Sequence, residues 1–373
     1  MNFSLKIAPV FSGRWFLVGL LLVVAGSLRI PLERDMEREF KEQGFRDWSP
    51  GLSSRDQLTQ AAFVGALGGF RSLVASAYHL KAHNSFVKKN WGEVERYRTV
   101  TASLQPKFWS YWDLAVWDMA WNAYGHYRGE AEEYGNDFRG WHIENIIMPT
   151  YLQKGIDFAK RGLEWLPDDY RLLKVIADIY DQKMGNPEKA AEWYLKASRK
   201  PQAPSHVYRA YAHQLTLCEG REEEAYRVTE DLYRNSGELT LTLLSDLERL
   251  EDDRARRAAR DIPYSRLRDA ALAENAGYLE MASFAMHLLE SRKDLPAAIG
   301  VYEKVVDHPR APSFYRRKLA FLTAENPKKA AQAYQMLKLL ALSDPAVLRR
   351  EDMSRIAQLE SRLGIPKAKR IKP

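Results

Sequence analysis

Two similar segments recur far apart in this chain, and both have the form of a helix start. The first is GNPEKAAEWYLKAS at 185–198, and the second is ENPKKAAQAYQMLK at 325–338. In each segment Asn-Pro is followed by two charged residues, two alanines and, after two further residues, a tyrosine. Proline in the first turn of a helix gives up no hydrogen bond, so Asn-Pro predicts a helix start. The recurrence predicts an array of similar helical units.

The spacing of apolar residues predicts an all-α fold. From residue 57 to the end, apolar residues recur with the 3.6-residue period of helices, in windows separated by proline, glycine and asparagine. No stretch alternates in the manner of a strand. We therefore expect consecutive antiparallel helix pairs, stacked as an α-solenoid.

The segment 168–201 gives the best view of one unit. Small residues stand where two helices would touch, with an aromatic residue beyond them and a proline after the second helix. These residues are Ala177, Tyr180, Ala190, Tyr194, Ala197 and Pro201. The pattern resembles the tetratricopeptide repeat (TPR) family, a helix-turn-helix unit of about 34 residues. The resemblance implies a TPR-like α-solenoid that binds partner proteins on its surface.

The resemblance divides the chain into regions. It covers about 150–236 and 275–345, with a helical insertion at 237–274 between them. The residues before the repeats, 53–149, are predicted to be helical and are rich in aromatic residues. A C-terminal helix and a basic tail occupy 346–373, and the tail is expected to be unfolded. The insertion carries the run RARRAAR at 254–260, whose acidic neighbours predict an exposed, ion-paired helix.

The N-terminal region 1–30 is predicted to be a membrane anchor or a signal segment. Residues 15–28, WFLVGLLLVVAGSL, carry no charge and follow Lys6 and Arg14. They are shorter than the roughly 20 residues of a spanning helix, so a cleaved signal and an uncleaved anchor both remain open. A juxtamembrane helix and linker follow at 31–52. These features predict a single-pass protein of a bacterial-type inner membrane, with its body outside the cytoplasm.

Charge and cysteine content limit the partners and the kinds of site that we expect for this chain. The net charge of +7 is a small excess in 373 residues, so we expect no nucleic-acid partner. Cys218 is the only cysteine, which excludes a disulfide or a cysteine zinc cage within one chain. The segment GALGG at 65–69 lacks the lysine of a phosphate-binding loop. No cofactor and no metal are therefore expected.

An aromatic cluster at 109–127 is the candidate partner-binding surface. Aromatic rings bury a large area at a small entropic cost, and they dominate many protein interfaces. We expect Trp117, Trp121 and Tyr124, at i, i+4 and i+7, to form a core stripe. The candidates for the exposed binding surface are Trp109, Tyr111, Trp112 and Tyr127.

The same region also admits a helical-repeat enzyme or a glycan-binding protein, with its site within 91–145. Such an enzyme would need carboxylates that converge in an aromatic pocket; the candidates are Asp118, Glu130, Asp137 and Glu144. His79 and His83 share a helix face but match no metal motif, so we expect them on a solvated face. An open aromatic surface would favour the binding protein. The sequence thus predicts a membrane-tethered scaffold or adaptor, and assembly of an envelope or secretion complex is the role expected for it.

Overall fold

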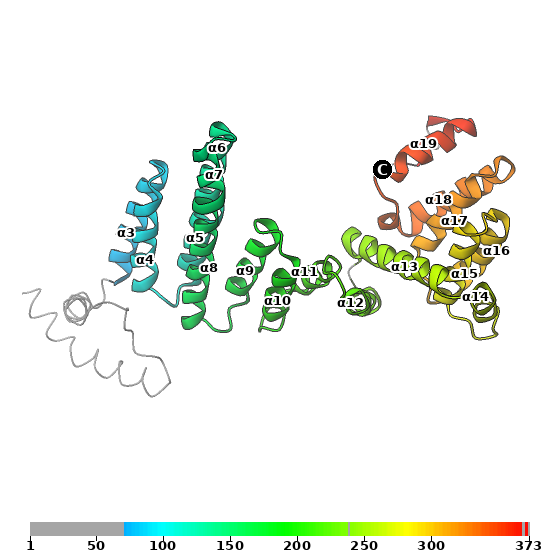
Figure 1. Cartoon of the computed structure of the whole chain (residues 1–373), viewed down its shortest axis with the longest axis horizontal. Coiled ribbons are helices and arrows are strands. Elements are labelled where there is room, and N and C mark those ends of the chain that lie inside the picture. The colour runs from blue at the N-terminus through cyan, green and yellow to red at the C-terminus, as the bar shows by residue number, and fades with distance from the viewer. Residues whose placement is uncertain (1–70, 238, 368–369, 372–373) are drawn as a thin grey trace, which may run out of the picture. The chain divides into compact units, whose positions relative to one another are not determined.

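The structure is a computed structural model that describes residues 71–237, 239–367 and 370–371 (Figure 1). Every regular element within these ranges is a helix, which confirms the all-α prediction. The predicted anchor and juxtamembrane helix lie outside the described residues. None of the helices within the described ranges combines the length and the apolar character needed to cross a bilayer.

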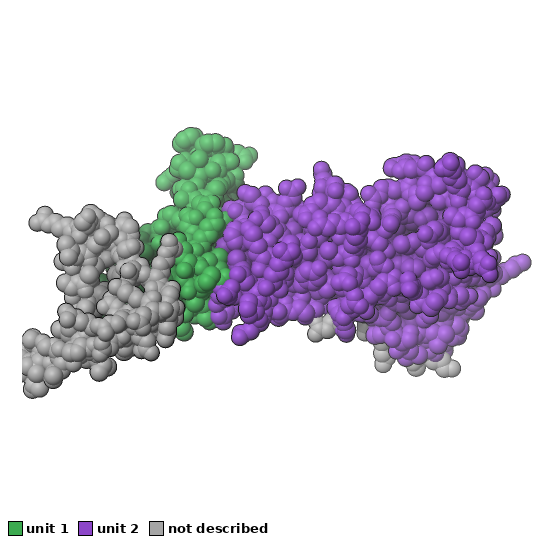
Figure 2. All heavy atoms as spheres, turned by 90° about the horizontal axis from the view of Figure 1, so that it is seen from below, with its two compact units in different colours: residues 1–167 green, residues 168–373 purple. Residues whose placement is uncertain are grey.

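The chain forms two compact units, residues 1–167 and 168–373, which Figure 2 colours green and purple. The helix Met148–Trp165, expected to open the repeat region at 150, belongs to the first unit. It belongs there because Gly155, a glycine of this helix, packs against Ala120 of an earlier helical segment in the same unit. A Cβ atom at Gly155 would lie 2.8 Å from the Cβ of Ala120.

The described part of unit 1 consists of two helical hairpins. α3 and α4 form the first, and Asn90 begins α4 by accepting a hydrogen bond from the Glu93 amide at 3.3 Å. In the second hairpin each arm is one continuous helical rod that contains a short π-helix, η2 or η3. The bounds are α3 (Arg71–Val87), α4 (Trp91–Leu104), α5 (Trp109–Trp117), η2 (Asp118–Ala123), α6 (Tyr124–Tyr134), α7 (Phe138–His142), η3 (Ile143–Ile147) and α8 (Met148–Trp165).

Unit 2 is a succession of paired helices, in which α9 pairs with α10, α15 with α16, and α17 with α18. This pairing of successive helices is the arrangement that the sequence predicts. The bounds are α9 (Tyr170–Gln182), α10 (Pro187–Ser198), α11 (Ser205–Leu215), α12 (Glu222–Asn235), α13 (Leu241–Asp261), α14 (Tyr264–Ala271), α15 (Tyr278–Glu290), α16 (Leu295–Asp307), α17 (Phe314–Ala324), α18 (Ala330–Ser343) and α19 (Asp352–Arg362). Two 3₁₀ turns, η4 (Pro327–Lys329) and η5 (Pro345–Val347), flank α18.

The α9–α10 pair shows how local sequence sets the unit. Gly185 takes a φ of +57°, which closes the turn after α9 and suits glycine. Asn186 then begins α10 by accepting a hydrogen bond from the Lys189 amide at 3.0 Å, with Pro187 in the first turn. The Tyr194 hydroxyl donates a hydrogen bond across the pair to Asp178 at 2.7 Å.

The residues assigned to packing in this unit occupy different environments. Ala177, Ala190 and Ala197 are fully buried, which lets the helices approach closely. Tyr180 is half-buried, with the Lys189 ammonium 5.2 Å from its ring centre. Pro201 lies in the exposed turn that follows α10.

Replacing Ala190 or Ala197 by leucine should lower the free energy of unfolding by about 1 to 3 kcal/mol, because extra methylenes cannot enter a full contact without strain. Urea unfolding monitored by circular dichroism measures this loss. The same change at Ala203, which is half-buried after α10, serves as the control and should have a smaller effect. Equal losses at all three positions would contradict the close contact.

α13 is the central helix of unit 2. It packs against α12 on one side and against α15 on the other. Two of its carboxylates also reach α17. Glu248 pairs with Arg317 at 2.6 Å, and Asp252 pairs with Lys318 at 2.6 Å. The helix that interrupts the repeat pattern in the sequence therefore joins its two parts in the fold.

The described part of the basic tail folds back, contrary to its predicted disorder. The Ile371 amide donates a hydrogen bond to Glu360 of α19 at 2.8 Å. Ile365 and Ile371 pack against the apolar cluster that α17, α18 and α19 share. Two isoleucines among the basic residues provide the apolar contact that a wholly charged tail would lack.

Candidate functional site

Two stacked tryptophans lie at the surface of unit 1. Trp117 ends α5 and is 44% exposed, and its ring centre lies 4.4 Å from that of Trp121 with an interplanar angle of 28°. Trp117 directly precedes the π-helix η2, and Trp121 lies within it. Such π-helices occur often at functional sites. Trp121 is half-buried, so the exposed aromatic area of the pair belongs mainly to Trp117.

The structure reverses part of the predicted core assignment. Trp112, a candidate for the exposed surface, is only 3% exposed, and its indole Nε1 donates a hydrogen bond to the Pro106 carbonyl at 2.9 Å. Trp117, expected in the core, is exposed instead. The reason is the close crossing of α8, where Gly155 requires a small partner such as Ala120 rather than a tryptophan.

The other candidates for the exposed surface are half-buried. Trp109 and Tyr111 lie in the first turn of α5, where the Tyr111 ring packs edge-on against Phe108 at 4.9 Å. Tyr127 stacks on Tyr151 of α8, with ring centres 5.1 Å apart. These rings contribute mainly to packing within the unit, so the exposed aromatic area lies elsewhere.

Sequence reasoning missed a second exposed aromatic site, on the short helix α7. Phe138 is 78% exposed and Trp141 is 53% exposed, with ring centres 6.1 Å apart. The i, i+3 spacing of the two rings was the available signal. Asp137 caps this helix by accepting a hydrogen bond from the Gly140 amide at 2.8 Å.

The carboxylates proposed for catalysis have separate partners. Asp118 is 2% exposed and pairs with the buried Arg98 at 2.7 Å. Asp137 is the cap of α7, and Glu130 lies 3.3 Å from His126. Glu144 is exposed on η3. Asp118, Asp137 and Glu130 thus each have a separate partner within the described residues.

His79 is not on a solvated face as expected. Its Nδ1 lies 2.9 Å from the Arg98 guanidinium, and burial together with that positive charge lowers the pKa of His79. Sequence spacing could not reveal this contact because Arg98 belongs to the next helix. Together with His83, it belongs to no group of three or more potential ligands in the described part of the chain.

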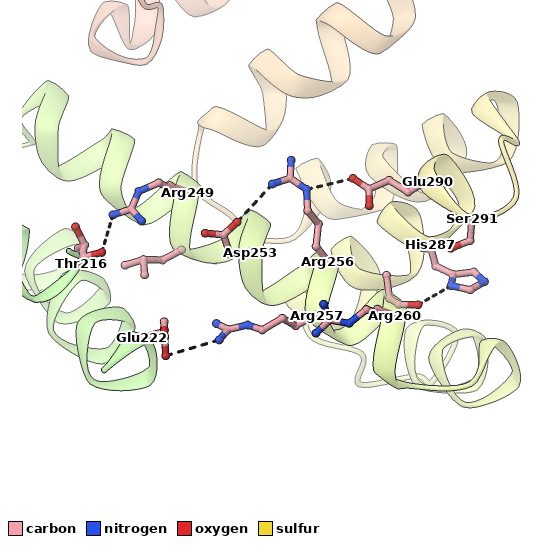
Figure 3. Close-up of a pocket in the computed structure, with 12 residues that line it drawn as sticks. Thr216, Glu222, Arg249, Asp253, Arg256, Arg257, Arg260, His287, Glu290 and Ser291 are labelled. Atoms are coloured by element: carbon pink, nitrogen blue, oxygen red, sulfur yellow. Dashed lines mark hydrogen bonds and ion pairs between the residues drawn. The ribbon is translucent and has the colours of Figure 1, made fainter. Parts of the chain in front are cut away.

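A groove of about 790 Å³ runs along α13 of unit 2 (Figure 3). Arg249, Asp253, Arg256 and Arg260 line it from one face of α13, since they follow at intervals of four, three and four residues. The other lining residues come from α13 and from the neighbouring α11, α12 and α15: Thr216, Glu222, Leu250, Arg257, Ala259, His287, Glu290 and Ser291.

The arginines of the groove differ in how firmly they are held. Arg256 lies between Asp253 at 3.4 Å and Glu290 at 3.1 Å (Figure 3). Arg257 has a longer contact, 3.9 Å to Glu222. Arg249 donates a hydrogen bond to the Thr216 carbonyl at 3.2 Å. The run at 254–260 is therefore an exposed, ion-paired helix face, as predicted.

No protein-family model matches the chain, and no curated protein matches it. Among solved structures it is similar to the TPR domain of P58(IPK), with 14% sequence identity over 84% of this chain and 97% of that chain, at a TM-score of 0.25. A TM-score this low carries no structural or functional inference. The helix pairing described above therefore rests on the contacts of this chain alone.

Proposed function

We propose that the protein is a helical-repeat scaffold that binds partner proteins and is tethered to a membrane by its N-terminal segment. The apolar run at 15–28 supports the tether, and the paired helices support a scaffold with an extended binding surface. A tethered scaffold would raise the local concentration of membrane-bound partners. Assembly of an envelope or secretion complex is the role we propose for it.

The observation that carries the binding role is the exposed Trp117, which stacks on the half-buried Trp121. Large aromatic rings are costly to leave in water, and tryptophan is the residue type most enriched among the anchors of protein interfaces. The helix beneath these rings is already packed by Trp112, Ala115 and Val116. The exposed part of Trp117 is thus the aromatic surface that we propose for a partner.

Truncating Trp117 to alanine should weaken the complex with a partner protein by about tenfold or more. The free energy of unfolding should fall by less than about 1 kcal/mol, since nearly half of the ring is already in water. In-cell crosslinking of the full-length chain, followed by mass spectrometry, identifies the partners and compares their yield between wild type and variant.

Trp112→Phe is the matched control for this experiment. It removes the hydrogen bond to Pro106 and should lower stability by about 1 to 2 kcal/mol without reducing partner capture. If Trp117→Ala captures the same partners at the same yield as wild type, the stack is not the binding surface. Release of the native chain from membranes by alkaline carbonate would disprove the tether.

A further inference from the structure

We propose that the groove along α13 binds a carboxylate-rich segment of a partner protein. This inference rests on the proposed scaffold function, and it assigns the chemistry of a partner to a surface in unit 2, whereas the tryptophan stack lies in unit 1. The groove is long enough to span α11, α12, α13 and α15, and its volume of about 790 Å³ suits a peptide segment rather than a single ion.

The cationic side chains in the groove outnumber the anionic ones. Four arginines line it, against the three carboxylates of Glu222, Asp253 and Glu290. The guanidinium fork binds carboxylates through two parallel hydrogen bonds, so each arginine that turns toward a ligand can hold one acidic side chain. Asp246 and Asp261, which pair with Arg249 and Arg260, lie outside the lining, so the groove itself presents four guanidinium groups to an approaching anionic segment.

Two of these arginines make only weak contacts within the protein. Arg249 is 45% exposed, lies 3.8 Å from Asp246 and donates one exposed hydrogen bond to the Thr216 carbonyl at 3.2 Å, and Arg257 is 46% exposed and lies 3.9 Å from Glu222. Exposed ion pairs stabilise a fold by only about 0 to 1 kcal/mol, so exchanging such a partner for a ligand carboxylate costs little. Arg249 and Arg257 are the residues that we expect to bind the ligand.

Arg256 has a different role. Because Asp253 and Glu290 hold its guanidinium from two sides, it stays in the middle of the groove and ties α13 to α15. His287 also joins α15 to α13, with Nδ1 2.9 Å from the Ala259 carbonyl. In the neutral ring that contact places the proton on Nδ1 and leaves Nε2 as an acceptor. Arg256 and His287 thus hold α13 and α15 together, while Arg249 and Arg257 can turn toward a ligand.

The lining favours a peptide over two other polyanions. Nucleic-acid grooves usually carry aromatic rings for base stacking, whereas the only ring in this lining is the imidazole of His287. A flat anionic bilayer would bring its charge against Glu222 and Glu290 on either side of α13. A narrow chain with spaced carboxylates can instead reach Arg249 and Arg257 one at a time.

The test uses the full-length chain in a non-ionic detergent and a fluorescently labelled, glutamate-rich peptide, with binding followed by fluorescence anisotropy. Replacing Arg249 and Arg257 together by glutamine should raise the Kd by at least about tenfold, equal to about 1.4 kcal/mol. The slope of log Kd against log salt concentration should also become shallower, because fewer charges take part in binding.

The matched control is the double variant Arg128→Gln with Arg227→Gln. It also removes two positive charges, but from exposed helix faces outside the groove. There Arg128 pairs with Glu132, and Arg227 pairs with Glu223. The control should bind the peptide as wild type does. Equal weakening of both double variants, or an unchanged Kd in the groove variant, would overturn the proposal, as would wild-type protein that does not bind the peptide.

Competition distinguishes the other polyanions. A single-stranded oligonucleotide or a short-chain phosphatidylserine that displaces the peptide at lower concentration would assign the groove to nucleic acid or lipid and overturn the proposal. The scaffold function fails separately, since it is read from Trp117-dependent crosslinks. If the wild-type protein does not bind the peptide but still forms those crosslinks, the proposal for the groove fails and the scaffold function stands.

Discussion

Replacing Arg317 by methionine should lower the free energy of unfolding of unit 2 by about 3 to 5 kcal/mol. Arg317 is 6% exposed and holds two carboxylates, Glu248 at 2.6 Å and Asp352 at 3.0 Å, and it donates a further hydrogen bond to the Val347 carbonyl. Methionine fills similar space but leaves both carboxylates without this cation. Glu248 keeps Arg349 as a partner at 2.5 Å, so the loss comes mainly from the negative charge of Asp352 and from the weaker compensation of Glu248.

Chemical denaturation, monitored by circular dichroism, measures this effect against the control Arg260→Met. Arg260 lies on the groove face of α13, is 74% exposed and pairs only with its neighbour Asp261, so its replacement should change stability by less than about 0.5 kcal/mol. Adding Glu248→Leu to Arg317→Met should recover part of the loss, because it removes one stranded charge. Similar losses for Arg317→Met and Arg260→Met would show that the buried network contributes nothing.

Replacing Glu251 by glutamine should stabilise unit 2 above neutral pH. Glu251 is fully buried on α13 and accepts a hydrogen bond from the Tyr278 hydroxyl at 2.8 Å, while its Oε2 has no hydrogen-bond partner. Burial raises the pKa of Glu251 from 4.5 to about 7. The Tyr278 and Tyr315 hydroxyls act in the opposite direction, and the nearby carboxylates Glu230 and Asp252 add to the rise.

The direction of the pH dependence follows from that shift. The folded chain holds the Glu251 proton up to about pH 7, whereas the unfolded chain releases it near pH 4.5. The stability from this group is complete below about pH 4.5 and is lost as the pH rises toward 7. The loss amounts to about 3 kcal/mol, since each pKa unit corresponds to about 1.4 kcal/mol.

Urea unfolding of Glu251→Gln and wild type at two pH values tests this. The variant should be more stable than wild type by about 3 kcal/mol near pH 8, and the difference should vanish near pH 4.5. Glu192→Gln on α10, at an exposed carboxylate that pairs with Lys196, should show no such dependence. A difference for Glu251→Gln that stays constant with pH would mean that the carboxyl does not titrate in this range.

The sequence predicts the helices of this fold well where the signals are local. Asn186 and Pro187 begin α10 because a cap and a first-turn proline act within four residues. The tryptophans were assigned less well. Trp112 and Trp117 lie on the same helix, and which of them is buried depends on α8, where Gly155 sets the crossing. Periodicity along one helix does not contain that information.

The charged sites were hidden for a similar reason. Arg317 and Glu248 stand 69 residues apart in the chain and meet only in the folded unit, where their side chains join α17 to α13. The arginine run was visible as a basic, ion-paired helix, but Thr216 and His287 reach the groove from other helices. A groove is a property of several elements, so its lining appears only once their arrangement is known.

The length of α13 has a consequence for how unit 2 unfolds. In an ideal repeat array each helix pair contacts only its neighbours, so that the ends can fray while the middle stays folded. α13 has 21 residues, a length of about 31 Å, and it contacts α11, α12 and α15 directly and α17 through Arg317 and Lys318. Unwinding it would release helices on both sides at once. The helix that looks like an interruption of the repeats thus makes their melting cooperative, so that the two groups of helix pairs share one transition.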